Sequence, residues 1–335
     1  MDEMVLGYQT ALDYWRAVRA AAGTQDLLDS EGRVFGGREL TLSERVSLAL
    51  NLCSTEPPLH VVVRDARKRH AHEGIVDHVW TGPLTSDHRV EIGRGISVCR
   101  MPAVFTQLGQ GLDVIELMRV ALEMAGTYGI APWAEKGSVQ DLRPLVDPAE
   151  LRSFAASARA LKVRGAARAC DSLASVVPGS NSPRETDVAI AFLLPRTKGG
   201  LLLPGFRMNE EIRLPRPLAD KLGQSTIKPD FSWPNGTVVE YDSEQEHLTP
   251  EARAKDERKR RAFRSVGMDC ITMTKGTFRS NAELNLLVGD LEGSLRLQRR
   301  PPTARILEAR ARLRERLFGP ESEEAALEAL HGKKE

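Results

Sequence analysis

The sequence predicts a mixed α/β protein built from two domains. Its 335 residues favour two domains, each long enough to bury a core of its own. Some segments carry apolar residues at the spacing of an amphipathic helix, whereas others are short β-branched runs bounded by turn residues. Because both kinds of segment occur in each half of the chain, neither an all-α nor an all-β fold is expected.

The first half predicts a smaller α+β domain over residues 1–130. Helical spacing and β-like runs follow one another along it, with helices expected over 8–22, 38–52 and 112–126 and strands over 60–63, 74–80 and 95–98. Gly-Pro and Ser-Asp pairs separate the runs, as turns do.

The rest of the chain divides into three parts. Residues 131–180 predict a helical connector, because a polar stretch containing Pro and Gly precedes a long Ala- and Arg-rich helix over 149–175. A second α/β domain is expected over 181–300. Residues 301–335 predict a charged helical tail, exposed to solvent or engaged in self-association or partner contact.

A β-hairpin is the clearest feature of the second domain. Asp230 precedes the apolar run Phe231-Ser232-Trp233, and Glu240 and Asp242 end the run that begins at Thr237. Between the two runs lies Pro234-Asn235-Gly236, and Asn-Gly is a strong hairpin signal. Glu240 and Asp242 face the same way because side chains alternate along a strand, and the turn brings Asp230 toward them.

Three converging carboxylates predict a metal site. Their mutual repulsion raises their pKa values unless a positive charge lies between them, and a hard divalent cation with oxygen ligands supplies it. Asp230 and Glu240 are expected to hold Mg²⁺ or Mn²⁺, with Asp242 completing the shell or holding a second ion. The alternative is three surface carboxylates at strand ends, which the apolar Val238-Val239 disfavours because an unpaired buried carboxylate is costly.

The same stretch resembles a nuclease family. Pro229-Asp230, nine further residues and then Glu240-x-Asp242 are similar to the signature of the PD-(D/E)xK endonuclease superfamily, in the variant of very-short-patch-repair-like (Vsr-like) proteins. The resemblance covers roughly 182–276 and implies a restriction-endonuclease-like domain, with a mixed sheet flanked by helices. It implies the core order helix, strand, strand, strand, helix, strand. Asp242 stands where most members carry Lys.

Two further catalytic residues follow from this resemblance. A Glu on the first helix faces the site in the family, which assigns that position to Glu185; the alternative is that Glu185 completes the capping box begun by Ser182. His247 follows the second strand and is expected to donate a proton or orient a water, unless it is an exposed loop histidine.

A basic helix is expected after Thr249-Pro250-Glu251. Its cationic residues predict contacts with backbone phosphates, which supply affinity without sequence preference. The alternative is a solvated basic face. The residues assigned to nucleic-acid binding are Arg253, Lys255, Arg258, Lys259, Arg260 and Arg264.

The first half resembles a different kind of protein. His60-Val61-Val62-Val63-Arg64, Gly95-Ile96-Ser97-Val98 and the helix after Met101-Pro102-Ala103 are similar to AbiEi-type antitoxins and regulators. In bacteria that module is often joined to a nuclease-like domain, so this resemblance implies an architecture. It also implies a cognate toxin as a partner.

The composition limits which cellular compartment and which binding partners we expect. Lys+Arg 47 against Asp+Glu 46 excludes a general polycation, so attraction to DNA must come from local patches. The cysteines Cys53, Cys99, Cys170 and Cys270 form no CxxC pair, which disfavours a disulfide framework. No basic leader begins the chain and no apolar run reaches the roughly 18 residues of a membrane span, so we expect a cytoplasmic protein.

These observations predict a Mg²⁺-dependent DNA endonuclease that cleaves phosphodiester bonds with a metal-activated water. The alternative is a non-catalytic DNA-binding antitoxin or transcriptional regulator of a type IV toxin–antitoxin system, which retains a nuclease fold. The absent Lys favours the alternative, and the intact carboxylate set favours the enzyme.

Overall fold

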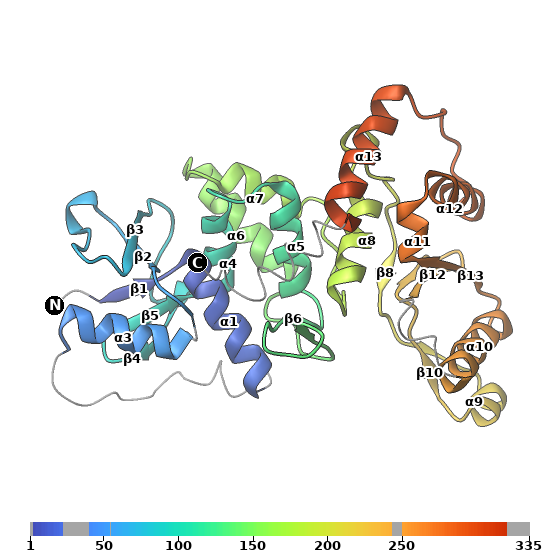
Figure 1. Ribbon diagram of the computed structural model, residues 1–335, viewed down its shortest axis with the longest axis horizontal. Helices are drawn as coiled ribbons and strands as arrows, with labels where there is room; N and C mark the ends of the chain where they lie inside the picture. The colour runs from blue at the N-terminus through green and yellow to red at the C-terminus, as the bar shows by residue number, and fades with distance from the viewer. Residues whose placement is uncertain (1–2, 23–39, 54, 243–249, 320–335) are drawn as a thin grey trace. The chain divides into compact units, whose positions relative to one another are not determined.

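The computed structural model describes residues 3–22, 40–53, 55–242 and 250–319, with the backbone alone at 21–22 and 250–256 (Figure 1). The chain forms two compact units, Met1–Val176 and Val177–Glu335. Both contain helices and sheets, which confirms the mixed α/β class. Among the residues described, no helix is both long and apolar enough to cross a membrane.

A five-stranded mixed sheet in the order β3-β2-β1-β5-β4 is the centre of the first unit. The central strand β1 pairs antiparallel with β2 and parallel with β5. The strands are β1 (Met4–Leu6), β2 (Leu59–Val63), β3 (Ile75–Val79), β4 (Arg89–Gly93) and β5 (Ile96–Cys99). The helices are α1 (Tyr8–Ala22), α3 (Leu42–Cys53), α4 (Met101–Leu108) and α5 (Val114–Met124), with short turns η1 (Ala66–Lys68) and η2 (Ser86–His88). These elements confirm the expected helices and strands of the first half.

The Ala- and Arg-rich segment forms two helices rather than the one expected over 149–175. They are α6 (Pro148–Ala160) and α7 (Ala166–Leu173), and a small ribbon of β6 (Gly129–Ile130) and β7 (Ser138–Val139) precedes them. Gly165 separates the helices at φ +88°, and a Cβ there would lie 2.6 Å from the backbone of Gly109. The helices pack on α4 and α5, and the units divide after Val176. Most of the expected connector is therefore part of the first unit.

The second unit contains a four-stranded sheet in the order β13-β12-β11-β8. Its strands are β8 (Arg207–Met208), β11 (Phe231–Ser232), β12 (Thr237–Asp242) and β13 (Asp269–Thr274), and β9 (Ile212–Arg213) pairs separately with β10 (Thr226–Ile227). The helices are α8 (Pro183–Leu193), α9 (Arg216–Leu222), α10 (Pro250–Ser265), α11 (Lys275–Arg279), α12 (Asn281–Ser294) and α13 (Ala304–Phe318), with the turn η3 (Arg196–Lys198). Apart from the insertion of β9, α9 and β10, the order α8, β8, β11, β12, α10, β13 is the one expected.

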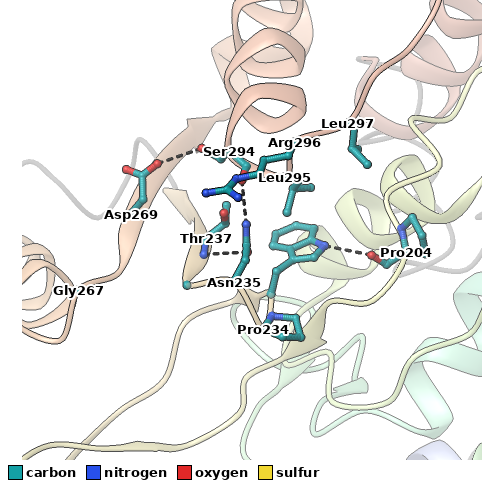
Figure 2. A pocket seen from close by; sticks show the side chains of 12 residues that line it. Pro204, Pro234, Asn235, Thr237, Gly267, Asp269, Ser294, Leu295, Arg296 and Leu297 are labelled. Atoms are coloured by element: carbon teal, nitrogen blue, oxygen red, sulfur yellow. Dashed lines mark hydrogen bonds between the residues drawn. The ribbon is translucent and has the colours of Figure 1, made fainter.

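The predicted hairpin is confirmed, with a three-residue loop. Phe231 pairs with Val239, and the turn closes through a hydrogen bond from Gly236 N to Trp233 O at 3.0 Å. Gly236 has φ +89°, a conformation that disfavours residues with a Cβ. Asn235 connects the turn to the end of α12: its Oδ1 accepts from Thr237 N, and its Nδ2 donates to Ser294 O at 2.8 Å (Figure 2).

The two faces of this sheet bury different clusters. Val238 packs against Ala262 and Phe263 of α10, which provides the crossover that a parallel β12–β13 pair requires. On the opposite face, the ring of Phe231 lies 5.2 Å from that of Phe192 on α8. Since side chains alternate along β12, Glu240 and Asp242 share the face of Val238 and point toward α10.

The helix predicted in the charged tail forms over residues 304–318, but the prediction that it is exposed is wrong for one side of it. Helix α13 buries Leu313, Leu317 and Phe318 in the second unit, and the ring of Phe318 stacks on that of Phe278 at 3.8 Å. Arg184 of α8 donates to Leu317 O. The apolar residues of this helix recur at i, i+4 and i+5, so one side packs although the helix as a whole is highly charged. Residues 320–335 lie outside the described part of the chain.

Candidate functional site

Asp230 and Glu240 face each other across the hairpin. The register that pairs Phe231 with Val239 sets Asp230 opposite Glu240 at the next position. Asp230 N donates to Glu240 Oε1 at 3.2 Å, and Tyr241 N donates to Asp230 Oδ2 at 2.7 Å. The other oxygen, Asp230 Oδ1, accepts no hydrogen bond from the described residues. The structure thus brings together the two carboxylates that the sequence placed at the centre of the site.

Lys259 is the cation of this site. Its Nζ donates to Glu240 Oε2, and it lies 5.8 Å from the centre of the Phe263 ring. Burial alone would lower the pKa of Lys259, but the charges of Glu240 and Asp230 outweigh it and the net direction is upward. The sequence assigned Lys259 to an outer basic face. The structure instead turns it inward, on the side of α10 that carries Ala262 and Phe263.

The carboxylates carry more negative charge than Lys259 balances. Burial, and then the charge of Asp230, raises the pKa of Glu240 to about 7 despite the opposing effect of Lys259. Burial raises the pKa of Asp230 as well, and Asp242 adds to that shift. A further positive charge beside these carboxyl groups would therefore stabilise their ionised forms.

Glu185 has the local contacts of the capping alternative. Its carboxylate accepts from Asn181 N at 2.9 Å, Ser182 Oγ at 2.9 Å and Asn209 Nδ2 at 2.5 Å. Burial, followed by the charge of Asp230, raises its pKa to about 7. Glu185 therefore holds the hydroxyl of Ser182, the N-cap of α8, and also lies within reach of the charge of Asp230.

Asp242 lies toward the outer end of β12. Its Oδ2 is 3.8 Å from Arg260 Nη2, and the side chain of Arg260 is 41% exposed. At that distance and exposure the pair is a weak ion pair.

The basic helix retains an outward face. Arg258 and Arg264 are exposed, whereas Lys259 and Arg260 point to the carboxylates. The backbone at Arg253 and Lys255 is helical, but their side chains are not described. His247 lies outside the described residues, so its expected role stays a prediction.

The donor set suits a hard cation in its chemistry. The ligands would all be oxygens, Asp230 Oδ1 accepts no hydrogen bond from the residues that the structure describes, and the negative charge there exceeds the positive charge beside it. Within the described residues, however, no three His, Cys, Asp or Glu side chains converge closely enough to form a ligand set. The ammonium group of Lys259 is hydrogen-bonded to Glu240 Oε2, so a metal ion that binds this oxygen would have to displace it.

A cavity of about 590 Å³ lies at the other end of the hairpin (Figure 2). Trp233 lines it and donates from its indole Nε1 to Pro204 O at 3.2 Å. Arg296 and Asp269 add charged groups to its rim. Because β12 begins at this cavity and ends at Glu240 and Asp242, the two sites lie at opposite ends of the strand.

A histidine pair distinguishes the first unit. His60 Nδ1 and His78 Nε2 are 2.8 Å apart, and the ring of Tyr8 stacks on His78 at 3.9 Å. Burial, and then the neighbouring His60, lowers the pKa of His78 to about 4. In the contact between these packed rings, one ring nitrogen donates and the other accepts.

No protein-family model, curated protein or solved structure matches this chain. The resemblances to Vsr-like nucleases and to AbiEi-type proteins therefore stay predictions.

Proposed function

We propose that this protein is a Mg²⁺-dependent DNA endonuclease whose second unit has a restriction-endonuclease-like fold. The observation that carries the proposal is the surplus of carboxylates at the end of the β11–β12 hairpin, with Lys259 on Glu240. The order of α8, the strands β8, β11 and β12, and the β12-α10-β13 crossover supports the fold.

Asp230 and Glu240 would hold the metal, and Asp242 would complete its shell. A bound Mg²⁺ or Mn²⁺ supplies Lewis acidity, which lowers the pKa of water and offsets charge on a phosphoryl oxygen. The chain fixes the two carboxylates by backbone hydrogen bonds from Tyr241 and Asp230, so their oxygens are positioned before substrate arrives.

Lys259 supplies the positive charge that the family pattern expects from the residue at Asp242. Its ammonium group lies on Glu240, and a third of its side chain reaches solvent. If Asp230 and Glu240 held a metal ion, the Lys259 ammonium group would lie beside it and would offset charge on a bound phosphate. Arg258 and Arg264, exposed on the same helix, extend positive charge along the DNA backbone.

The test is nicking of supercoiled plasmid with Mg²⁺ or Mn²⁺. Asp230→Asn should slow nicking by at least about 100-fold, as the loss of an electrostatic catalytic group does. Asp220→Asn, an exposed carboxylate on α9, is the matched control and should nick like the parent. Calorimetric titration of Mn²⁺ without DNA gives a second readout, in which only Asp230→Asn should weaken binding. Nicking by Asp230→Asn at the parent rate would remove Asp230 from the mechanism.

A second function is favoured by one observation. Lys259 and Arg260 already offset part of the carboxylate charge, which would suit a non-catalytic DNA-binding regulator that retains a nuclease fold. Such a protein would bind DNA with a steep salt dependence and nick nothing with either metal. A protein that neither nicks nor retains DNA at low salt would contradict both functions, and would favour a module that binds a partner protein.

A further inference from the structure

Three arginines from separate segments of the second unit gather around α13. Arg196 comes from η3, Arg299 from the segment after α12, and Arg310 from the middle of α13. Close packing brings them together: Gly199, at φ +91°, lies so near α13 that an added Cβ would be 2.3 Å from Ala309 O. The turn η3 is therefore held directly against the backbone of Arg310.

Two of these arginines have structural partners. Arg299 Nη2 donates to Leu202 O at 2.5 Å, and Arg196 Nη2 donates to Arg300 O at 2.9 Å. These bonds join the segment after α12 to η3 and to the loop that follows it. A purely structural role therefore explains the placement of Arg196 and Arg299.

Arg310 has no such partner. Arg310 is only 8% exposed, yet within the described residues no hydrogen bond or ion pair reaches its guanidinium group. Its Nε is fully buried without an acceptor, as is Nε of Arg196. Since burying an unpaired charge destabilises a protein, packing alone does not explain an arginine here.

The local charge is strongly positive. In the described part of the chain, the charged groups that act on Arg310 are Arg196, Arg299 and Glu292. Glu292 lies 3.9 Å from Arg299 Nη1, and its side chain is 30% exposed. Burial, followed by the charge of Arg196, lowers the pKa of Arg310, as expected of cations that lack a full counter-charge.

The surplus of two positive charges indicates the kind of ligand. A phosphate monoester carries about −1.5 to −2 at neutral pH and three acceptor oxygens, which matches that surplus. A carboxylate or an internal phosphodiester brings a single negative charge. Guanidinium groups also match phosphate in geometry, because their donors form a planar fork.

We infer that Arg310, together with Arg196 and Arg299, forms a binding site for a terminal phosphate group. The site uses none of the residues proposed for metal binding, so it stands whether or not the protein cleaves DNA. Two sources share this chemistry: the phosphorylated end of a nucleic-acid strand, and a free phosphate or small phosphate ester.

The first experiment compares thermal unfolding of the full chain in phosphate and in chloride, at pH 7.5 and equal ionic strength. Phosphate should raise the Tm of the parent, because a ligand that binds the folded state stabilises it. Arg310→Met keeps the apolar stem and should lose this response. It should also be at least as stable as the parent in chloride, because it removes an uncompensated buried charge. Arg312→Met, exposed on the same helix, is the matched control and should respond like the parent.

The second experiment measures affinity by calorimetric titration with inorganic phosphate. Arg196→Met, at a half-buried position, should weaken binding by at least about tenfold, the effect of losing one charge-assisted hydrogen bond. It keeps the inference testable if Arg310→Met fails to fold. A parent that shows no phosphate response in either experiment, or an Arg310→Met variant that retains it, would overturn the inference.

An oligonucleotide pair separates the two sources. If the site takes strand ends, a 5′-phosphorylated oligonucleotide should bind at least about tenfold more tightly than both its 5′-hydroxyl form and inorganic phosphate. If it takes a small phosphate compound, inorganic phosphate should bind as tightly as the phosphorylated oligonucleotide. Both outcomes support the site, whereas equal binding of the two oligonucleotides with no binding of phosphate would contradict it.

Discussion

Replacing Lys259 by Met should destabilise the second unit, because it leaves Glu240 and Asp230 without their nearest positive charge. Met keeps most of the apolar stem, so the packing on Phe263 is largely preserved. The change therefore isolates the ammonium group. It should act on the stability of the protein before any metal or DNA is added.

The size of the effect follows from the burial of the pair. Two charges in contact at about 3 Å interact by about 5 kcal/mol at an effective dielectric constant of 20, before desolvation is subtracted. The side chains are 33% exposed at Lys259 and 17% exposed at Glu240, so the pair lies between a surface pair of 0–1 kcal/mol and a buried one of about 3–5 kcal/mol. We expect a loss of about 2 kcal/mol.

The assay is urea unfolding at pH 7.5 in the presence of a chelator, arranged as a double-mutant cycle with Glu240→Gln. The coupling between Lys259 and Glu240 should be about 2 kcal/mol. Lys228→Met is the matched control: it breaks the pair with Glu211, whose side chains are both more than half exposed, and should cost less than about 1 kcal/mol. A Lys259–Glu240 coupling below about 0.5 kcal/mol would refute the argument that this pair holds the site together.

Three further predictions concern the rest of the molecule. Because the folded-state pKa of His78 is below its ordinary value, the unfolded chain binds more protons on acidification, and the unfolding free energy should fall by about 1 kcal/mol as the pH is lowered from 6.5 to 4, after allowance for the partial exposure of His78. In urea titrations, His78→Gln should remove this pH dependence, whereas His72→Gln should not. Gly199→Ala should lower the unfolding free energy by at least about 2 kcal/mol, because the added Cβ would collide with the backbone of α13. Gly205→Ala, which has a similar φ but open space around it, should cost about 1 kcal/mol, and equal losses would show that close packing at Gly199 is unimportant. Phe231→Ala, fully buried, should cost about 3–5 kcal/mol by the same measurement, and a loss below 2 kcal/mol would place Phe231 outside the core.

The hairpin and its carboxylates were predictable because they depend on local rules. Asn235-Gly236 specifies a tight connection, and the period of two along a strand places Glu240 and Asp242 on one face. The loop is one residue longer than a two-residue Asn-Gly turn because Pro234 also belongs to it and Gly236 takes the left-handed conformation. This extra residue sets the register: a two-residue turn would pair Phe231 with Glu240, whereas the three-residue loop pairs Phe231 with Val239 and sets Asp230 opposite Glu240.

The inward position of Lys259 was missed, although the sequence carries a signal for it. Ala262, Phe263 and Val266 were expected to pack inward, and Lys259 precedes them by three, four and seven residues. That spacing puts Lys259 on the same stripe of the helix. The density of charge in this segment favoured a solvated face, but a lysine can bury its stem and reach a carboxylate with its end.

The packing of α13 was harder to predict from the sequence. Nearly half of its residues are charged, which is typical of exposed helices. Leu313 and Leu317 mark an apolar side, but the partners of that side, such as Phe278, come from another segment and depend on tertiary contacts. The pairing of Gly199 with Ala309 is likewise a contact between distant residues that no local pattern encodes.

Among the residues described in the second unit, two groups depart from the rule that buried charges are balanced, and they have opposite signs. Asp230 and Glu240 share one lysine, whereas Arg196, Arg299 and Arg310 share one glutamate. If burial had been shaped by stability alone, apolar residues of similar volume would serve better at both places. Proteins retain such conflicts where a ligand resolves them. A cation at the first place and a phosphate group at the second would do so, and each should raise stability independently of the other. Added together, Mg²⁺ and inorganic phosphate should therefore shift the Tm by about the sum of their separate shifts, and two ligands that compete would show that the two places are one site.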